Sequence, residues 1–229
     1  MHKTRLVACL VISLLAIFRL DAQEVYSFTS DSDLSNTCIN SITEDSRKNV
    51  WICTRNGLNR FDGVKMNIYQ SRPETESSLK NDVVMCVLDV GREGVLVGLD
   101  VGVQLYSYYR DDFTDLPLLA VNGDTVRAHV ISMVRTHDDE VYVCTAGYGL
   151  YKLQRDTHGC THFNEISHSY KANPVRMMED SRKNLWVIDS DGNIYRETDG
   201  HISMMDNVPE AGELCESSSG QIYLSTTHR

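Results

Sequence analysis

A regular spacing of large apolar residues constrains the fold of this chain more than any other feature of its sequence. When the 229 residues are aligned with themselves on Trp51, the match recurs at Leu96, Tyr142, Trp186 and Tyr223, at intervals of 45, 46, 44 and 37 residues. Intervals of this size are typical of repeat architectures, in which each unit buries its apolar face against its neighbours. The sequence therefore predicts four to five copies of one structural unit.

Each unit has the pattern of several short strands. Aliphatic residues flank every anchor on both sides, as expected for strands that are buried on both faces. Six or seven residues beyond the anchor, the first four units have a glycine that predicts a hairpin turn: Gly57, Gly102, Gly149 and Gly192. Nine residues before the anchor, an apolar position predicts another strand: Ile42, Val87, Met133 and Met177. Weaker strands are expected at residues 65–70 and 160–165.

Short strands at this interval predict an all-β fold, a β-propeller of four-stranded blades. A β-sandwich also has short strands and frequent turns, but it does not explain a constant interval. A helical solenoid is excluded because the apolar runs are rich in Val, Ile, Tyr and Thr and are separated by glycines. We therefore expect a partial propeller over residues 23–229, with about four to five blades present in an incomplete ring.

Residues 1–22 predict a secretory signal peptide. Lys3 and Arg5 precede an apolar run over residues 6–18, and a cleavage position follows Ala22. As a helix, the apolar run would span only about 20 Å, which is too short for a membrane core. Six cysteines follow the signal peptide, and we expect free thiols because Cys53 and Cys144 fall at the same place in two repeats, inside apolar runs.

Composition and motifs argue against several classes of function. A formal net charge of −10 leaves no basic stripe for phosphates, so no nucleic-acid partner is expected. The sequence has no nucleophile elbow, zinc-protease helix or phosphate-binding loop, so we predict no catalytic residue and no cofactor in this chain. His158, Cys160 and His162 are zinc ligands by type, but a fourth ligand is not in sight and no metal site is predicted.

The first unit has the residues of a known repeat. Its stretch INSITEDSRKNVWICTRNGLNRFDG, residues 39–63, resembles the two-component regulator propeller repeat, which usually reads D-x-x-G-N-x-W-x-G-T and then G-L-x-x-Y/F-D. The positions that fit are Asp45, Asn49, Trp51, Thr54, Gly57, Leu58, Phe61 and Asp62. Lys48 and Cys53 stand where that repeat usually has glycine. The fourth unit fits through Asp180, Asn184, Trp186 and Gly192.

This resemblance implies the N-terminal part of the periplasmic sensor region of a hybrid two-component system histidine kinase. Members of the family typically bind oligosaccharides, regulate glycan-utilisation genes and form homodimers through the sensor region. They have seven-bladed propellers, so a chain with four to five blades is expected to be a fragment, a truncated product or half of a split one. The kinase activity would belong to the full-length relative, because this chain has no kinase motif.

Ligand-binding residues are expected on the loops that gather around the propeller axis, since loops on rigid scaffolds carry function. The candidates from the hairpin turns are Arg55, Asn56, Asp100, Tyr148 and Asp191, and two more lie near inner strands, Arg127 and Arg176. Arginine suits an acidic or sulfated sugar, and tyrosine can stack on a pyranose ring.

Two functions from other classes stay open at this point. A secreted propeller enzyme that acts on glycans, sialidase-like or lyase-like, would need arginines around a tyrosine nucleophile, and Arg127, Arg176 and Tyr148 are candidates by residue type only. A protein-interaction scaffold would need neither a sugar site nor catalysis.

Overall fold

The computed structural model describes residues 33–166, 173–198 and 201–226, so the expected signal peptide at residues 1–22 lies outside the described residues. The described part consists of strands and one short 3-10 helix, Gly91–Glu93, which confirms the all-β class. No described segment is a helix of the length and apolarity needed to cross a membrane.

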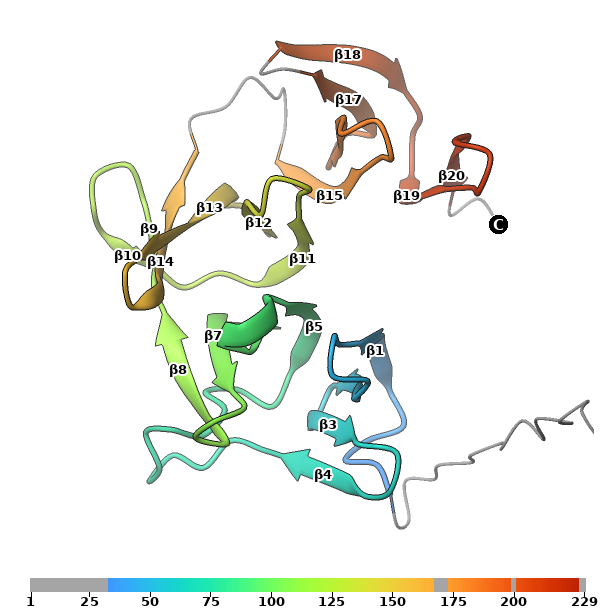
Figure 1. The fold of residues 1–229 in the computed structure, drawn as a ribbon. Coiled ribbons are helices and arrows are strands. Elements are labelled where there is room, and N and C mark those ends of the chain that lie inside the picture. The colour runs from blue at the N-terminus through green and yellow to red at the C-terminus, as the bar shows by residue number, and fades with distance from the viewer. Residues whose placement is uncertain (1–32, 167–172, 199–200, 227–229) are drawn as a thin grey trace, which may run out of the picture.

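Each repeat folds into one sheet of antiparallel strands, to which the third blade adds a short strand in parallel pairing (Figure 1). The first blade holds β1 (Ile39–Glu44), β2 (Val50–Thr54), β3 (Gly57–Phe61) and β4 (Met66–Tyr69), and the second holds β5 (Val84–Asp89), β6 (Val95–Leu99), β7 (Gly102–Ser107) and β8 (Asp112–Leu116). The third holds β11 (Val130–Arg135), β12 (Val141–Thr145), β13 (Gly149–Asp156) and β14 (Gly159–Glu165), and its outer edge is extended by β9 (Leu118–Leu119), which pairs in parallel with β14, and by β10 (Thr125–Val126). The fourth holds β15 (Pro174–Glu179), β16 (Leu185–Asp189), β17 (Asn193–Thr198) and β18 (His201–Asn207), and β19 (Ala211–Glu216) pairs with β20 (Ile222–Thr226) in a fifth sheet.

The sheets lie around an arc with β1, β5, β11, β15 and β19 on its inner side (Figure 1). Within the described residues the sheets do not close into a ring, which confirms the partial propeller. The two weaker strands expected from the sequence are present as β4 and β14. The five repeat anchors lie in β2, β6, β12, β16 and β20, the second strand of each sheet.

The turn between the first two strands of each blade has one backbone hydrogen bond in common in all five sheets, although the turn of the second blade also contains the 3-10 helix. The residue six positions before the anchor donates its N–H to the carbonyl four residues later, over 2.8 to 3.1 Å, in the pairs Asp45 to Asn49, Val90 to Gly94, Thr136 to Glu140, Asp180 to Asn184 and Ser217 to Gln221. Lys48 and Lys183, three positions before the anchor, have φ angles of 68° and 65°. This left-handed conformation explains why the related repeat usually has glycine there.

A buried aspartate locks this turn in the first and fourth blades. Asp45 is 3% exposed, and its carboxylate accepts hydrogen bonds from the Asn49 side chain at 2.9 Å and from Trp51 Nε1 at 2.6 Å. Asp180 accepts from Asn184 at 2.8 Å and from Trp186 at 2.8 Å in the same way. The spaced Asp, Asn and Trp of the repeat are therefore one hydrogen-bonded unit that fixes the turn to the anchor.

Neighbouring blades are joined by a recurring bond from a turn to an inner strand. The last residue of an inner strand is a carboxylate that accepts a backbone N–H from the first turn of the preceding blade. The three bonds are Ser46 to Asp89 at 2.8 Å, His137 to Glu179 at 2.6 Å and Ser181 to Glu216 at 2.7 Å. Because the same two positions meet each time, the repeat sets the register between blades as well as within them.

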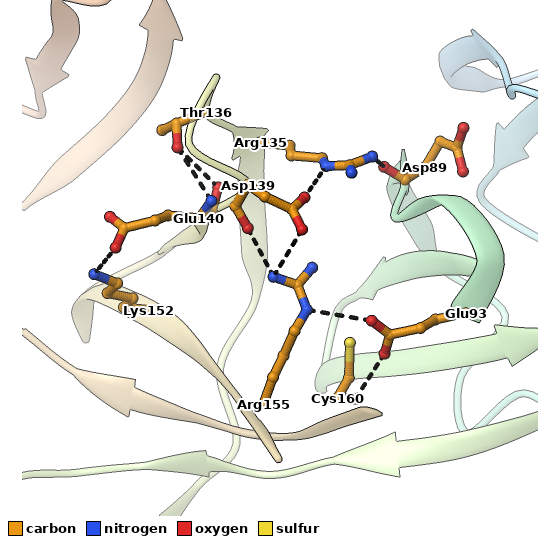
Figure 2. Close-up of polar contacts among 9 residues, drawn as sticks. All are labelled: Asp89, Glu93, Arg135, Thr136, Asp139, Glu140, Lys152, Arg155 and Cys160. Atoms are coloured by element: carbon orange, nitrogen blue, oxygen red, sulfur yellow. Dashed lines mark hydrogen bonds and ion pairs between the residues drawn. The ribbon is translucent and has the colours of Figure 1, made fainter. Parts of the chain in front are cut away.

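The contact between the second and third blades departs from this rule. The last residue of the third blade's inner strand is Arg135, at the position where β5, β15 and β19 end in a carboxylate. Its guanidinium donates to the backbone carbonyl of Asp89 at 3.4 Å (Figure 2). Arg155 of the third blade lies 3.3 Å from the carboxylate of Glu93 in the second, and the Cys160 backbone N–H donates to the same carboxylate at 2.7 Å (Figure 2). At this contact one ion pair and two hydrogen bonds thus take the place of the bond from turn to inner-strand carboxylate that joins the other described blades.

The cores lie between the sheets, and the ends of the arc are open. Trp51 is fully buried between the first two blades, while the corresponding anchor of the fifth sheet, Tyr223, is 54% exposed. Val87 is 6% exposed, whereas Ile42, its equivalent in the first blade, is 61% exposed. The open ends thus expose Ile42 of the first inner strand and Tyr223 of the fifth sheet, whereas β2 of the first blade is buried on both faces.

The six cysteines of the described part are free thiols, as the sequence predicts. Burial raises the pKa of Cys53 and of Cys144 to about 12, which keeps both thiols protonated at neutral pH. They therefore act as small apolar side chains in the blade cores.

Candidate functional site

The predicted hairpin turns all lie on one face of the arc, which we call the turn face. Each turn donates a backbone N–H to the connector that leads into the first strand of its own blade. The four bonds are Arg55 to Cys38, Asp100 to Val83, Ala146 to His129 and Ser190 to Asn173, over 2.8 to 3.2 Å. Turns and connectors therefore form one continuous surface, because in an antiparallel sheet the second turn and the start of the first strand are at the same end.

A groove of about 360 Å³ opens on the turn face between the second and third blades. Its apolar surface comes from Leu99, Val101, Val103, Leu116, Pro117, Leu118 and Val126. Its polar groups are Lys80, Gln104, Asp115, Thr125 and Arg127. An apolar surface with a few converging polar groups is the usual composition of a small-molecule site.

Arg127 is the one of the seven predicted residues that lines this groove. It is exposed, and no hydrogen bond or ion pair within the described part of the chain engages its guanidinium. Asp100 lies between two lining residues, and its carboxylate is 2.6 Å from Nδ1 of His129, two residues beyond Arg127. The pair of Asp100 and His129 thus joins the turn on one wall to the connector on the other.

The other predicted residues lie elsewhere and stay predictions. Arg176 is on the inner strand β15, where its guanidinium is 2.5 Å from Glu213 of β19. Tyr148 is 52% exposed at its turn, and Arg55, Asn56 and Asp191 are exposed turn residues. Among the described residues, no hydrogen bond or ion pair joins any two of the seven.

Sequence reasoning missed Lys80, Gln104 and Asp115 in the groove. Gln104 is a polar residue that is 1% exposed, in a strand whose other residues are mostly buried and apolar. A polar residue at a strand position that faces a core is a recognisable signal, since buried polar groups need partners. Lys80 and Asp115 carry no such signal, because exposed charges are common in connectors and outer strands.

The clustered tyrosines between the first two blades, Tyr106 buried and Tyr69 partly buried, do not favour the tyrosine-nucleophile enzyme. The hydroxyls of Tyr69 and Tyr106 donate to Oδ1 of Asp111 at 2.8 and 2.5 Å, and Arg60 donates to Tyr106. Burial, and then the hydrogen bond to Asp111, raise the pKa of Tyr106 to about 12, and burial also raises that of Tyr69. A nucleophile needs the opposite shift, so this cluster reads as a structural network that joins the blades.

The two candidate histidine ligands have neighbouring threonine side chains as partners. Nδ1 of His158 lies 3.3 Å from Thr157 Oγ1, and Nδ1 of His162 lies 3.0 Å from Thr161 Oγ1. In residues 33–166, 173–198 and 201–226, no group of three or more His, Cys, Asp or Glu side chains is placed to hold a metal ion.

Comparison with known sequences gives a family-model match at the first blade and a curated relative of part of the chain. The family model described as two component regulator propeller matches residues 33–56. Histidine kinase P4 of Formosa agariphila is 40% identical over 53 residues, which are 23% of this chain and 4% of that protein.

Comparison with solved structures supports the fold. The extracellular domain of a hybrid two-component system from B. thetaiotaomicron superposes with a TM-score of 0.71 at 18% identity, over 88% of this chain and 29% of that domain. A gluconolactonase from Xanthomonas campestris gives a TM-score of 0.55 at 11% identity, over 82% of this chain and 69% of that enzyme. The chain thus spans less than a third of the sensor domain. This chain is a β-propeller, and the start of its first blade matches the two component regulator propeller model.

Proposed function

We propose that this chain is the N-terminal part of a periplasmic ligand-sensing propeller of a hybrid two-component signalling protein, and that it binds oligosaccharides to regulate glycan-utilisation genes. The regulator repeat, the local identity to a histidine kinase and the fold shared with an extracellular sensor domain support this proposal. Export through the signal peptide at residues 1–22 is part of it.

The observation that carries the ligand-binding part is the groove between the second and third blades. It combines an apolar surface with the unengaged guanidinium of Arg127, on the face where the connectors and hairpin turns meet. Arginine binds carboxylate and sulfate groups through two parallel hydrogen bonds. We propose that the groove holds one sugar unit of the oligosaccharide and that Arg127 binds an acidic substituent on it.

Signalling needs a second part, because a ligand changes an equilibrium only if it binds one state more tightly. We propose that this second part is a homodimer formed through the whole sensor region, in which bound oligosaccharide favours one arrangement of the two protomers.

The experiment is calorimetric titration of the purified chain with acidic and neutral oligosaccharides. Arg127→Ala should weaken binding of a uronate or sulfated oligosaccharide by about tenfold to a hundredfold, because a charge-assisted hydrogen bond contributes about 1.5–3 kcal/mol. Arg110→Ala is the matched control, since Arg110 is half-exposed on the opposite face and paired with Asp112 at 2.9 Å. Equal affinity of the wild type and Arg127→Ala would remove Arg127 from the site, and turnover of the sugar would favour the enzyme instead.

A further inference from the structure

Gln104 connects two walls of the groove from inside the second blade. It lies on β7 opposite Val97 of β6 and opposite Asp115 of β8. Its amide nitrogen donates to Oδ1 of Asp115 at 2.7 Å and to the Ser78 carbonyl at 3.2 Å, and its amide oxygen accepts the Lys80 backbone N–H at 3.1 Å. One buried amide thus holds the connector at residues 78–80 and the carboxylate on the outer strand.

These bonds fix the amide in one orientation. Gln104 is 1% exposed, and leaving a buried donor or acceptor without a partner costs about 1–3 kcal/mol. A side chain in this setting has little freedom to rotate, so the groups that it holds are preorganised before any ligand arrives.

Asp115 and Lys80 are left with open hydrogen-bonding capacity towards the groove. The Asp115 side chain is 57% exposed, and its second oxygen lies 3.6 Å from the Lys80 ammonium, beyond hydrogen-bonding distance. A carboxylate can accept from one hydroxyl while a neighbouring ammonium donates to the next. Two adjacent hydroxyls on a pyranose ring offer that pair of partners.

The corresponding positions of other blades do not build this arrangement. Asn59 of the first blade faces Ile52, and its amide nitrogen donates to Ser35 and to the Ile52 carbonyl. The third and fourth blades have Tyr151 and Tyr195 at this place in the register. The long amide of Gln104 is therefore a feature of the second blade and not a requirement of the repeat.

We propose that Gln104 is a positioning residue that sets the specificity of the groove. By fixing Asp115 and the Lys80 backbone, it makes the groove select a pyranose with two adjacent free hydroxyls. This inference rests on the proposed function, because it assumes that the groove takes a sugar, and it names the part of the sugar that the second blade reads.

The test compares methyl pyranosides of gluco, galacto, manno and glucurono configuration with their monodeoxy analogues, by saturation-transfer NMR on the purified chain. For the wild type, removal of one of the two hydroxyls should weaken binding by about tenfold, because the hydrogen bond from that hydroxyl to a charged side chain is lost. Gln104→Met keeps the side-chain length without the amide. It should reduce the ratio of the two affinities, parent pyranoside over deoxy analogue, to about twofold or less. Asp115→Asn should reduce it too, and it changes only a half-exposed side chain.

A control and a separate readout keep the outcomes apart. Asp112→Asn alters a carboxylate on the same strand, at the opposite face and paired with Arg110, and should leave the ratio unchanged. If the wild type binds neither a pyranoside here nor an oligosaccharide in the calorimetric titration, the proposed function and this inference both fail, whereas binding of an oligosaccharide with no loss on removal of either hydroxyl sinks the inference alone. If the wild type discriminates and both Gln104→Met and Asp115→Asn keep the full ratio while remaining folded by near-UV circular dichroism, the inference alone is wrong.

Discussion

At the scale of single residues, Lys48 occupies a backbone conformation that lysine adopts at a cost. Its φ of 68° is left-handed, and its side chain is 81% exposed and paired with Glu44. An exposed pair of this kind contributes little to stability, whereas the left-handed conformation costs about 1–2 kcal/mol for a residue with a Cβ. The backbone effect should therefore decide the outcome of a substitution.

We accordingly expect Lys48→Gly to raise the free energy of unfolding by about 0.5–1 kcal/mol, less than the full strain because glycine also loses more entropy on folding. The measurement is the midpoint of urea unfolding. Lys65→Gly is the matched control, because Lys65 lies in another turn of the same blade and is not left-handed, so glycine there should lower stability. Equal losses in both variants would show that the left-handed strain at Lys48 is negligible.

At the scale of strands and turns, the joint between blades is a small and repeated interaction. Glu179, the last residue of β15, accepts the backbone N–H of His137 from the third blade at 2.6 Å. Glu179→Ala leaves that N–H to water at the rim, so we expect a loss of about 1 kcal/mol in the free energy of unfolding. Glu76→Ala, in an exposed connector, controls for the change of charge and should have little effect. Thermal unfolding of the two variants should separate them, and indistinguishable midpoints would argue that the bond does not stabilise the joint.

The same scale shows what the sequence can and cannot predict. Hydrophobic spacing and turn residues are enough to predict features that are local in the sequence. These include the strands around Trp51 and Trp186, the hairpin turns at Gly57 and Gly192, and the weak strand β14. The groove is different, because it depends on a contact between Gln104 and a connector 24 to 26 residues away that has no repeat pattern. The joint of Arg155 with Glu93 likewise links residues far apart in the sequence.

At the scale of the whole molecule, three buried aspartates tie the stability of the arc to pH. Asp45, Asp180 and Asp189 are at most 8% exposed. Burial by itself would raise the pKa of each carboxyl group. Asp45, however, accepts hydrogen bonds from Tyr108, Trp51 and Asn49, and Asp180 and Asp189 accept comparable sets. These hydrogen bonds outweigh burial and hold all three pKa values below the usual range. The unfolded chain would titrate these groups near a pKa of about 4.

Between neutral pH and about pH 5 the three carboxylates are ionised in both states, so they give no slope of stability with pH. Below that range the unfolded chain takes up protons that the folded blades do not bind. The free energy of unfolding should therefore fall by up to about 1.4 kcal/mol per pH unit for each aspartate. This fall continues until the pH passes the lowered pKa of the folded state.

Urea unfolding measured from pH 7 to pH 3 tests this, with Asp180→Asn as the variant that removes one group. The variant should be less stable than the wild type at pH 7, because the amide cannot accept all the bonds that the carboxylate accepts, and should lose stability less steeply below pH 5. A wild-type stability that stays constant down to pH 3 would mean that these aspartates titrate alike in both states, and the locks between turn and anchor would then not depend on ionised carboxylates.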